Sequence, residues 1–411
     1  MDTTLLFTAA LQLPDPWRVS GVELRDGEGG GRESHITIGF GPGPRFSCPH
    51  AQCGREACPM HDVRNRVWRH LNLFRYQAFI HAGVPRVSCP EHGVRAVPVP
   101  WARPGSGSTL SFEAMVVEPA KSQPVADMAG QVGEHDTGSW RFIGHDVDRA
   151  RLYGDDTGVE AIGIDGTGRK GHRCITVVAD PAERNVIRVV PGRDADTVKR
   201  FALDFMDHNG DPNRVAPVTC DMSPGSAQGI RGHLPNAARV IDEFHVIKHA
   251  NEAVDKVRKT GGRAQPPAQA HEIPVAAQRG GPDRAPAGDP GITLRKQRVR
   301  TGRACRMRGT LQDIHATSTS RMQAEAGFRT WCSWMMHSRP EPMKTLARRI
   351  RRHWRDILTY FDHRCTNAIL EGLNGIIQHI KTRARGLRNM DHFPTMIHLT
   401  CGKLDLATVT I

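Results

Sequence analysis

The sequence predicts a multidomain α/β protein in which a mixed β-sheet with flanking helices follows two smaller N-terminal modules. Strand-like apolar runs begin after Gly158 and then alternate with amphipathic helical segments. Cysteine and histidine residues cluster between Cys48 and His92, and a basic region with helical periodicity extends from Arg300 to Met396. These regions differ enough in composition to form separate structural units.

The composition indicates a folded protein with a polyanionic partner. The chain has 411 residues, and its hydrophobic content of 38% is sufficient for roughly two to four domains. A formal net charge of +13 suits DNA or RNA, although arginine-rich proteins are also common in GC-rich genomes. No run approaches the roughly 20 apolar residues of a membrane span, and the first residues lack the basic region of a secretory signal. We therefore expect a cytoplasmic protein whose ten cysteines are thiols or metal ligands.

The N-terminal part predicts a small β segment and a metal-binding module. Residues 1–44 contain alternating runs such as SHITIGF between glycine-rich breaks. Residues 45–100 carry two close pairs of ligand side chains, separated by a loop of some 35 residues. Three thiolates and one imidazole are a common tetrahedral set for structural zinc, here Cys48, Cys53, Cys89 and His92. Cys58 and His61 offer a third pair, so the spacing leaves the ligand set open, and buried thiols without metal are the alternative.

Residues 101–157 predict a helix-turn-helix. The run PVADMAGQVGEHDTGSWRFIGHDV resembles two short helices joined by a glycine-containing turn. A recognition helix that begins near Thr137 would carry Trp140 and Arg141 into a major groove. Helix pairs of this spacing also occur in proteins that bind nothing, but a neighbouring zinc module and a positive net charge favour DNA binding.

The mixed sheet is expected in residues 158–260. The runs EAIGID, HRCITVVAD and NVIRVVPG predict three consecutive strands. After them a helix (ADTVKRFALDFM), a strand (VAPVTCD), a helix (SAQGIRGHL), a strand (ARVIDEF) and a helix (HVIKHANEAVDKVRK) alternate. This order fits a sheet with helices on its faces.

Three carboxylates occupy distinctive positions in this pattern. Asp165 ends the apolar run AIGI, Asp221 ends the run VAPVTC, and Glu371 lies far away on a helix. An RNase H-like strand-transfer nuclease needs such a set, because acids gathered around two Mg²⁺ ions about 4 Å apart stabilise both the attacking and the leaving oxygen of a phosphodiester. A single acid in such a place is usually a helix cap or a solvated charge, but three in this order are much harder to explain that way.

Further polar residues flank the three acids. Asp242 and His245 follow a predicted strand, where they could form a helix N-cap with a satisfied histidine, or His245 could position the nucleophile or the phosphate. Cationic side chains close to the acids would contact the DNA backbone; they are Arg169, Lys170, Lys381, Arg383 and Arg385.

The segment 261–294 does not fit the helical pattern around it. Its Pro/Gly/Ala/Arg composition is typical of a linker. The alternative hypothesis is a local frameshift, because suitable codons for His271 to Leu294, read one base later, give TKYPWLRNEADLTERQRETLASL, a helix-forming sequence. Sequencing the gene across this interval distinguishes the two.

Several long blocks resemble the ISL3-family insertion-sequence transposases. They are GIDGTGRKGHRCITVVAD, VTCDMS, LPNAARVIDEFHVIKHANEAVDKVR and TNAILEGLNGIIQHIKTRARGLRN. FSCPHAQCG, CPMHDVRNRVWRHLNL, VPRVSCPEHGVRAVPVPWAR and SFEA resemble the family's zinc-binding and helix-turn-helix region. The resemblance covers nearly the whole chain apart from 261–294. Two positions depart from the family pattern: the first cysteine pair is wider than C-x-x-C, and Gly166 stands where an acid is common.

The resemblance implies an RNase H-like DDE core interrupted by an α-helical insertion. The core would comprise 158–260 and 351–411, with the insertion at 261–350 and Asp165, Asp221 and Glu371 as the Mg²⁺ (or Mn²⁺) ligands. Asp242 and His245 match a D-x-x-H pattern found in several such cores. The expected protein is a bacterial, nucleoid-associated DNA transposase that acts as an oligomer on terminal inverted repeats and target DNA. The rivals are a catalytically impaired DNA-binding repressor and a nuclease without strand transfer.

Overall fold

A computed structural model of the chain describes residues 3–27, 31–168, 174–262, 300–383 and 392–406. They belong to two compact units. The first comprises Met1–Leu152, Lys381–Thr400 and Leu404–Ile411, and the second comprises Tyr153–Ile380 and Cys401–Lys403. Most of the segment 261–294 lies outside the described residues, as do Arg169, Lys170 and Arg385.

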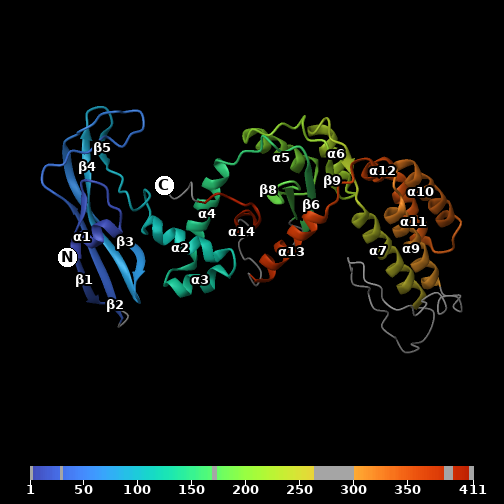
Figure 1. The fold of residues 1–411 in the computed structure, drawn as a ribbon, viewed down its shortest axis with the longest axis horizontal. Coiled ribbons are helices and arrows are strands. Elements are labelled where there is room, and N and C mark those ends of the chain that lie inside the picture. The colour runs from blue at the N-terminus through green and yellow to red at the C-terminus, as the bar shows by residue number, and fades with distance from the viewer. Residues whose placement is uncertain (1–2, 28–30, 169–173, 263–299, 384–391, 407–411) are drawn as a thin grey trace. The chain divides into compact units, whose positions relative to one another are not determined.

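The first unit is built on a five-stranded sheet (Figure 1). Its strands run in the order β1-β2-β4-β3, and β5 pairs with β4. Their bounds are β1 Trp17–Asp26, β2 Arg32–Phe40, β3 Met60–Leu73, β4 Tyr76–Cys89 and β5 Gly93–Ala96. The strand expected at SHITIGF is β2, and it lies parallel to β4. The first 44 residues and the cysteine-rich stretch therefore share one sheet.

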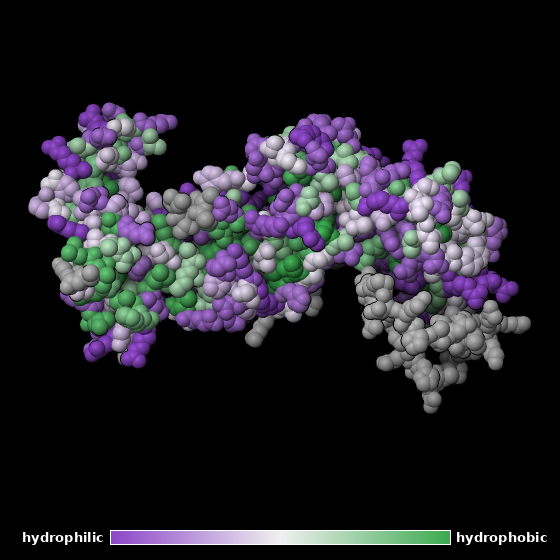
Figure 2. Space-filling model, viewed as in Figure 1, coloured by the Kyte–Doolittle hydropathy of each residue, from purple (hydrophilic) through white to green (hydrophobic). Residues whose placement is uncertain are grey.

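The core of this sheet is aromatic. Trp17 and Trp68 are buried, and both pack edge-on against Trp101. The helix α1, Thr3–Ala10, precedes the sheet; its sequence TTLLFTAA has no polar alternation, so the expected β segment does not begin there. Leu5 and Leu6 of α1 are exposed, and Figure 2 shows hydrophobic residues gathered on this part of the unit.

Helices complete the first unit. They are α2 Leu110–Ala120, α3 Val125–Val132, α4 Asp136–Leu152 and α14 His392–Cys401. Gly133 caps α3 with φ +69°, a left-handed conformation that favours glycine, so the predicted glycine-containing turn between two helices is confirmed. Phe112 of α2 and Phe142 of α4 are fully buried and meet edge-on.

The second unit contains the expected mixed sheet, in the order β10-β9-β6-β7-β8. The strands are β6 Ile162–Gly168, β7 Cys174–Asp180, β8 Asn185–Pro191, β9 Val218–Cys220 and β10 Arg239–Val240. β6, β7 and β8 are antiparallel, whereas β9 and β10 run parallel to β6. The helices α5 (Ala195–Asp207) and α6 (Pro224–His233) follow as predicted. Phe201 and Phe205 of α5 are buried in the hydrophobic core between this sheet and its helices α5 and α6.

A helical body with its own core follows the sheet in sequence. Its helices are α7 Glu243–Gly262, α9 Arg300–Thr317, α10 Arg321–Met336, α11 Glu341–Arg352 and α12 Trp354–His363. Trp331 of α10 is buried, and its Nε1 donates to the Met307 carbonyl oxygen at 2.7 Å. The core of this body continues to Phe361, beyond the expected end of the insertion at residue 350. No helix in the described part of the chain has the length and apolar character needed to cross a bilayer.

Candidate functional site

Two of the predicted acids are brought together by strand pairing. Ile164 of β6 lies opposite Cys220 of the parallel strand β9. The next residues along the chain, Asp165 and Asp221, therefore lie side by side where this pairing ends. Asp221 directly follows β9, whereas Asp165 lies within β6, which continues to Gly168 in its pairing with β7. Both side chains are half-buried and line one cavity of about 880 Å³.

Each of these carboxylates has a polar partner that sequence reasoning missed. Asn374 Nδ2 donates to Asp165 Oδ2 at 2.6 Å. Arg193 Nη2 donates to Asp221 Oδ2 at 2.8 Å, and its side chain is 52% exposed. Arg193 also lies beside Gly166, where an added Cβ would be 3.4 Å from its side chain. A Cβ at position 166 would thus be in van der Waals contact with the Arg193 side chain.

The third acid is carried by α13, Ala368–Arg383, which packs closely on β6 (Figure 1). Gly163 allows this approach, because a Cβ there would lie 1.9 Å from Leu370 Cδ1 and 3.1 Å from Thr219 Oγ1. Glu371 follows Leu370 and is half-buried. It lines a second cavity, which adjoins that of Asp165 because Lys248 lines both.

The electrostatic environment links Glu371 to the other acids. Burial raises the pKa of its carboxyl group, and the charges of Asp242 and Asp165 raise it further. The negative charges of Asp242 and Asp165 thus favour a cation near Glu371. The charges of Asp165 and Glu371 therefore interact, but the three predicted acids line two adjoining cavities, and in the described residues their oxygen atoms do not form a set within 4.8 Å of one another.

Asp242 and His245 form a buried pair that anchors α13. His245 Nδ1 donates to Asp242 Oδ1 at 2.9 Å, and the Asn367 backbone N–H donates to Asp242 Oδ2 at 2.8 Å. The Asn367 side chain in turn accepts a bond of 2.6 Å from Thr219 of β9. Asp242 caps α7, as one of the sequence alternatives expects, and His245 lines the cavity of Asp165 and Asp221. The role of His245 in positioning a nucleophile or a phosphate stays a prediction.

The electrostatics of the pair favour two charged groups. Burial opposes ionisation of Asp242, yet the hydrogen bond from His245 holds its pKa below the usual value. Burial likewise opposes the imidazolium, yet the bond to Asp242 and the charges of Asp165 and Asp221 raise the pKa of His245.

A metal-ligand cluster lies in the first unit. The ligand atoms of Cys48, Cys53, Cys89 and His92 all lie within 4.8 Å of one another, and no other set of three or more such side chains in the described ranges does so. The Cys53 and Cys89 sulfur atoms are 3.6 Å apart, and His92 Nδ1 lies 3.6 Å from Cys89 Sγ and 4.0 Å from Cys48 Sγ. Sulfur atoms bound tetrahedrally to zinc at about 2.3 Å lie about 3.8 Å apart, so this donor set fits zinc.

The mutual distances single out these four ligands, and their surroundings favour metal binding. The hydrogen bond from His92 lowers the pKa of the Cys89 thiol to about 6, which favours the thiolate that a metal requires. Cys58, from the third possible pair, is buried and its sulfur faces the Arg55 carbonyl. The predicted loop between the pairs contains the long hairpin of β3 and β4, which brings the pairs together.

The predicted DNA-contacting residues differ in how available they are. Arg141 is exposed on α4, whereas Trp140 stacks on His392 with ring centroids 3.9 Å apart. Lys381 lies 5.3 Å from the ring centre of Phe393. Arg383 donates to the Lys121 carbonyl oxygen at 3.1 Å. Of this group, Arg141 is the side chain most open to a phosphate.

The comparison with known families agrees with this geometry. A family model described as a transposase, that of the ISL3 DDE domain, matches residues 162–397, more than half of the chain. A helix-turn-helix domain of transposase family ISL3 matches residues 97–137, and the zinc-finger of transposase IS204/IS1001/IS1096/IS1165 matches residues 44–92. The protein is a transposase by class. Within that class, the chain belongs to the ISL3 family.

Full-length relatives support the same conclusion. The transposase for insertion sequence element IS1557 of Mycobacterium tuberculosis is 28% identical over 386 residues, covering 85% of this chain and 84% of the relative. The transposase for insertion sequence element IS1001 of Bordetella parapertussis is 26% identical over 368 residues, covering 83% and 86%. The helix-turn-helix match ends at residue 137, the second residue of α4, so Trp140 and Arg141 lie outside it.

Proposed function

We propose that this ISL3-family transposase binds the terminal inverted repeats of its element and carries out phosphodiester hydrolysis followed by strand transfer. The observation that carries the proposal is the placement of Asp165 and Asp221 side by side on two neighbouring parallel strands, at the point where the pairing of β6 with β9 ends, with the Glu371 helix packed on β6. Three antiparallel strands followed by two parallel ones also support an RNase H-like core. The helical body between Asp221 and Glu371 then corresponds to the insertion.

The residues of the site have distinct roles in this proposal. Asp165, Asp221 and Glu371 would hold Mg²⁺ or Mn²⁺, because carboxylate oxygens are the ligands that these hard cations prefer. Bound metal ions would supply positive charge to the attacking and leaving oxygens. His245, anchored by Asp242, donates from its second ring nitrogen to the scissile phosphate and so positions it.

The reaction proceeds by two in-line displacements. In the first, a water oxygen bonds to the scissile phosphorus, the bond to the 3′ oxygen breaks, and that oxygen leaves as a 3′-OH after protonation. In the second, the oxygen of the same 3′-OH bonds to a phosphorus of the target strand as its proton is lost, and the displaced 3′ oxygen of the target takes up a proton and leaves as a 3′-OH. Arg193 is poised to neutralise the phosphate because it already lies beside both aspartates.

The first unit would recognise the DNA ends. Zinc held by Cys48, Cys53, Cys89 and His92 would fix the end of the β3–β4 hairpin as a closed structural site. The helix-turn-helix that follows would dock in a major groove, with Arg141 as a backbone contact and Trp140 as a packing residue. Lys381 and Arg383 remain candidates for contacts to phosphates, as do Arg169, Lys170 and Arg385.

Strand transfer distinguishes this function from its rivals. Purified protein is incubated with Mg²⁺, a supercoiled plasmid and a labelled duplex carrying one end of the element. A transposase joins the labelled 3′ end to the plasmid, whereas a nuclease without strand transfer cuts the duplex and leaves the plasmid unlabelled. Specific binding to the end without cutting would instead identify a repressor derived from a transposase. Because two ends must be held together, we expect the joined product to form in an oligomer.

A further inference from the structure

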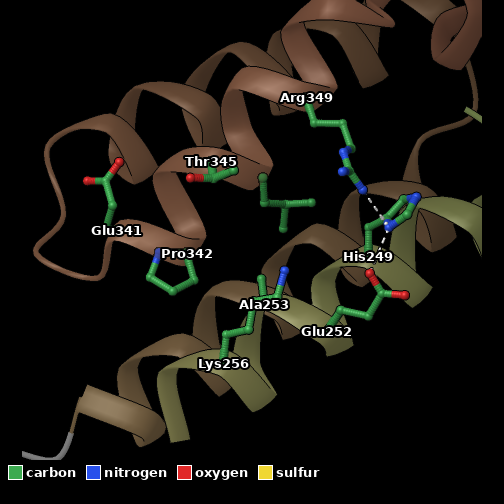
Figure 3. A pocket seen from close by; sticks show the side chains of 9 residues that line it. His249, Glu252, Ala253, Lys256, Glu341, Pro342, Thr345 and Arg349 are labelled. Carbon is green, nitrogen blue, oxygen red and sulfur yellow. Dashed lines mark hydrogen bonds and ion pairs between the residues drawn. The ribbon is translucent and has the colours of Figure 1, made fainter. Parts of the chain in front are cut away.

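A groove extends from the catalytic acids along the helical body. The cavity of Asp165 and Asp221 shares His249 and Arg349 with a second cavity of about 320 Å³ between α7 and α11. Figure 3 shows this second cavity, with Arg349 of α11 reaching toward His249 of α7. The two cavities therefore adjoin at these residues, and together they form the groove, with the acids Asp165 and Asp221 in the larger one.

The helical repeat explains which side chains line the groove. On α7, His245, His249, Glu252 and Lys256 follow one another at intervals of three or four residues, so they form one stripe. On α11, the apolar residues turn into the helical core; they are Met343, Leu346, Ala347 and Ile350. The arginines between them are left outside, and Arg349 and Arg352 lie on the flank that faces the groove.

The groove carries more positive than negative charge beside the acids. Six cationic side chains line the larger cavity: Arg193, Arg231, Arg239, Lys248, Arg349 and Arg352. Two of these already neutralise acids of the same cavity, because Arg193 pairs with Asp221 and Arg239 pairs with Asp356 at 2.9 Å. The other four are exposed, and they outnumber the remaining acids of the cavity, Asp165 and Glu252.

The contact between the two helices leaves Arg349 able to bind another group. Arg349 Nη1 lies 2.8 Å from His249 Nδ1, and Glu252 Oε2 lies 3.0 Å from the same nitrogen. One ring nitrogen cannot accept a bond from Arg349 and donate one to Glu252 at the same time. An incoming phosphate oxygen could therefore take Arg349 from His249, and His249 would then donate to Glu252.

We propose that this groove binds the sugar-phosphate backbone of the DNA strand that enters the active site, with Lys248, Arg349, Arg352 and Arg231 contacting successive phosphates. The inference rests on the proposed function and extends it, because it makes the helical body a DNA-binding surface. In this proposal, cations beside the sheet and cations of the helical body contact the same DNA strand. Several exposed cations beside the acids, rather than one enclosed cation, are suited to a polymer of phosphates.

Two double variants of α11 test the proposal. Arg349→Gln/Arg352→Gln removes two cations from the groove, and Arg348→Gln/Arg351→Gln removes two from the opposite flank of the same helix. Both pairs change the net charge equally, and glutamine matches arginine in helix propensity. The affinity of the full-length chain for a labelled DNA duplex and a labelled single strand, both of arbitrary sequence, is measured at several salt concentrations without Mg²⁺.

The expected result is a change in salt dependence that only the groove pair produces. Two lost phosphate contacts should reduce the slope of log K against log salt concentration by about 1.4 to 1.8, whereas the opposite-flank pair should keep the wild-type slope. Equal slopes for the two double variants would overturn the proposal. A second result would also overturn the proposal. Inorganic phosphate would raise the unfolding temperature of the wild type but not of the groove pair, while the groove pair would bind DNA with the wild-type slope, and the groove would then be a site for small anions.

A parallel cleavage assay separates this inference from the function on which it rests. If the wild type cuts DNA with Mg²⁺ but the groove pair retains the wild-type slope, the groove assignment is wrong and the transposase chemistry stands. If the groove pair loses slope while the wild type does not cut, the groove binds DNA and the proposed chemistry is wrong.

Discussion

Replacing Gly163 by alanine should disturb the site without touching any proposed metal ligand. The new Cβ would lie 1.9 Å from Leu370 Cδ1, and Leu370 is only 2% exposed, so the side chain has little room to turn away. Overpacking of this kind costs about 1–3 kcal/mol. Relief requires α13 to move away from β6, and Glu371 moves with it. A displacement of about 1 Å at a catalytic group can lower the rate about 100-fold.

The assay compares cleavage rate and thermal unfolding in the full-length chain. Gly372→Ala is the matched control, because a Cβ at that position of α13 meets no atom within 4 Å and should stabilise the helix by up to about 1 kcal/mol. Leu370→Val in the Gly163→Ala background should recover part of the lost stability and rate, since the two residues are in contact. Wild-type cleavage and unfolding in Gly163→Ala would refute the close packing of α13 on β6.

Three further results are expected. Cys53→Ser should lose bound zinc in metal analysis and unfold at a lower temperature, whereas exposed Cys305→Ser should do neither. Arg193→Ala should raise Mn²⁺ affinity in calorimetric titration by at most about fivefold, because its half-exposed ion pair contributes no more than about 1 kcal/mol. In Mg²⁺-free buffer, Asp242→Asn should destabilise most between about pH 4 and 6.5, as followed by urea midpoints. The lowered pKa of Asp242 and the raised pKa of His245 both add stability in that window. The contribution of Asp242 is lost as the pH falls through its folded-state pKa, and the contribution of His245 is lost as the pH rises through its folded-state pKa.

Local sequence patterns were sufficient for the elements that bury a regular apolar face. The runs before Asp165 and Asp221 lie in the adjacent parallel strands β6 and β9, which brings the two acids side by side, although β6 continues past Asp165 to Gly168. The strand expected in ARVIDEF is only two residues long, because Asp242 ends it by capping α7. The run TTLLFTAA lacked a pattern that distinguishes helix from strand.

Partners that lie far apart in sequence could not be predicted in the same way. Nothing in the residues around Arg193 indicates that its guanidinium group pairs with Asp221, because that contact depends on the fold of the β8–α5 connection. The stacking of Trp140 on His392 likewise joins residues about 250 positions apart, so the indole's packing role was not visible in the helix-turn-helix pattern. The choice of zinc ligands required the β3–β4 hairpin.

The most direct test of the carboxylate site is Mg²⁺-dependent cleavage of DNA that carries the element's ends, by the wild type and by Asp165→Asn. Asp196→Asn is the control, because that acid is 65% exposed on α5 and pairs only with Arg200 among the ion pairs of the described residues. Wild type and control should cut the DNA, whereas Asp165→Asn should bind it equally well and not cut it. Undiminished cutting by Asp165→Asn would contradict the site.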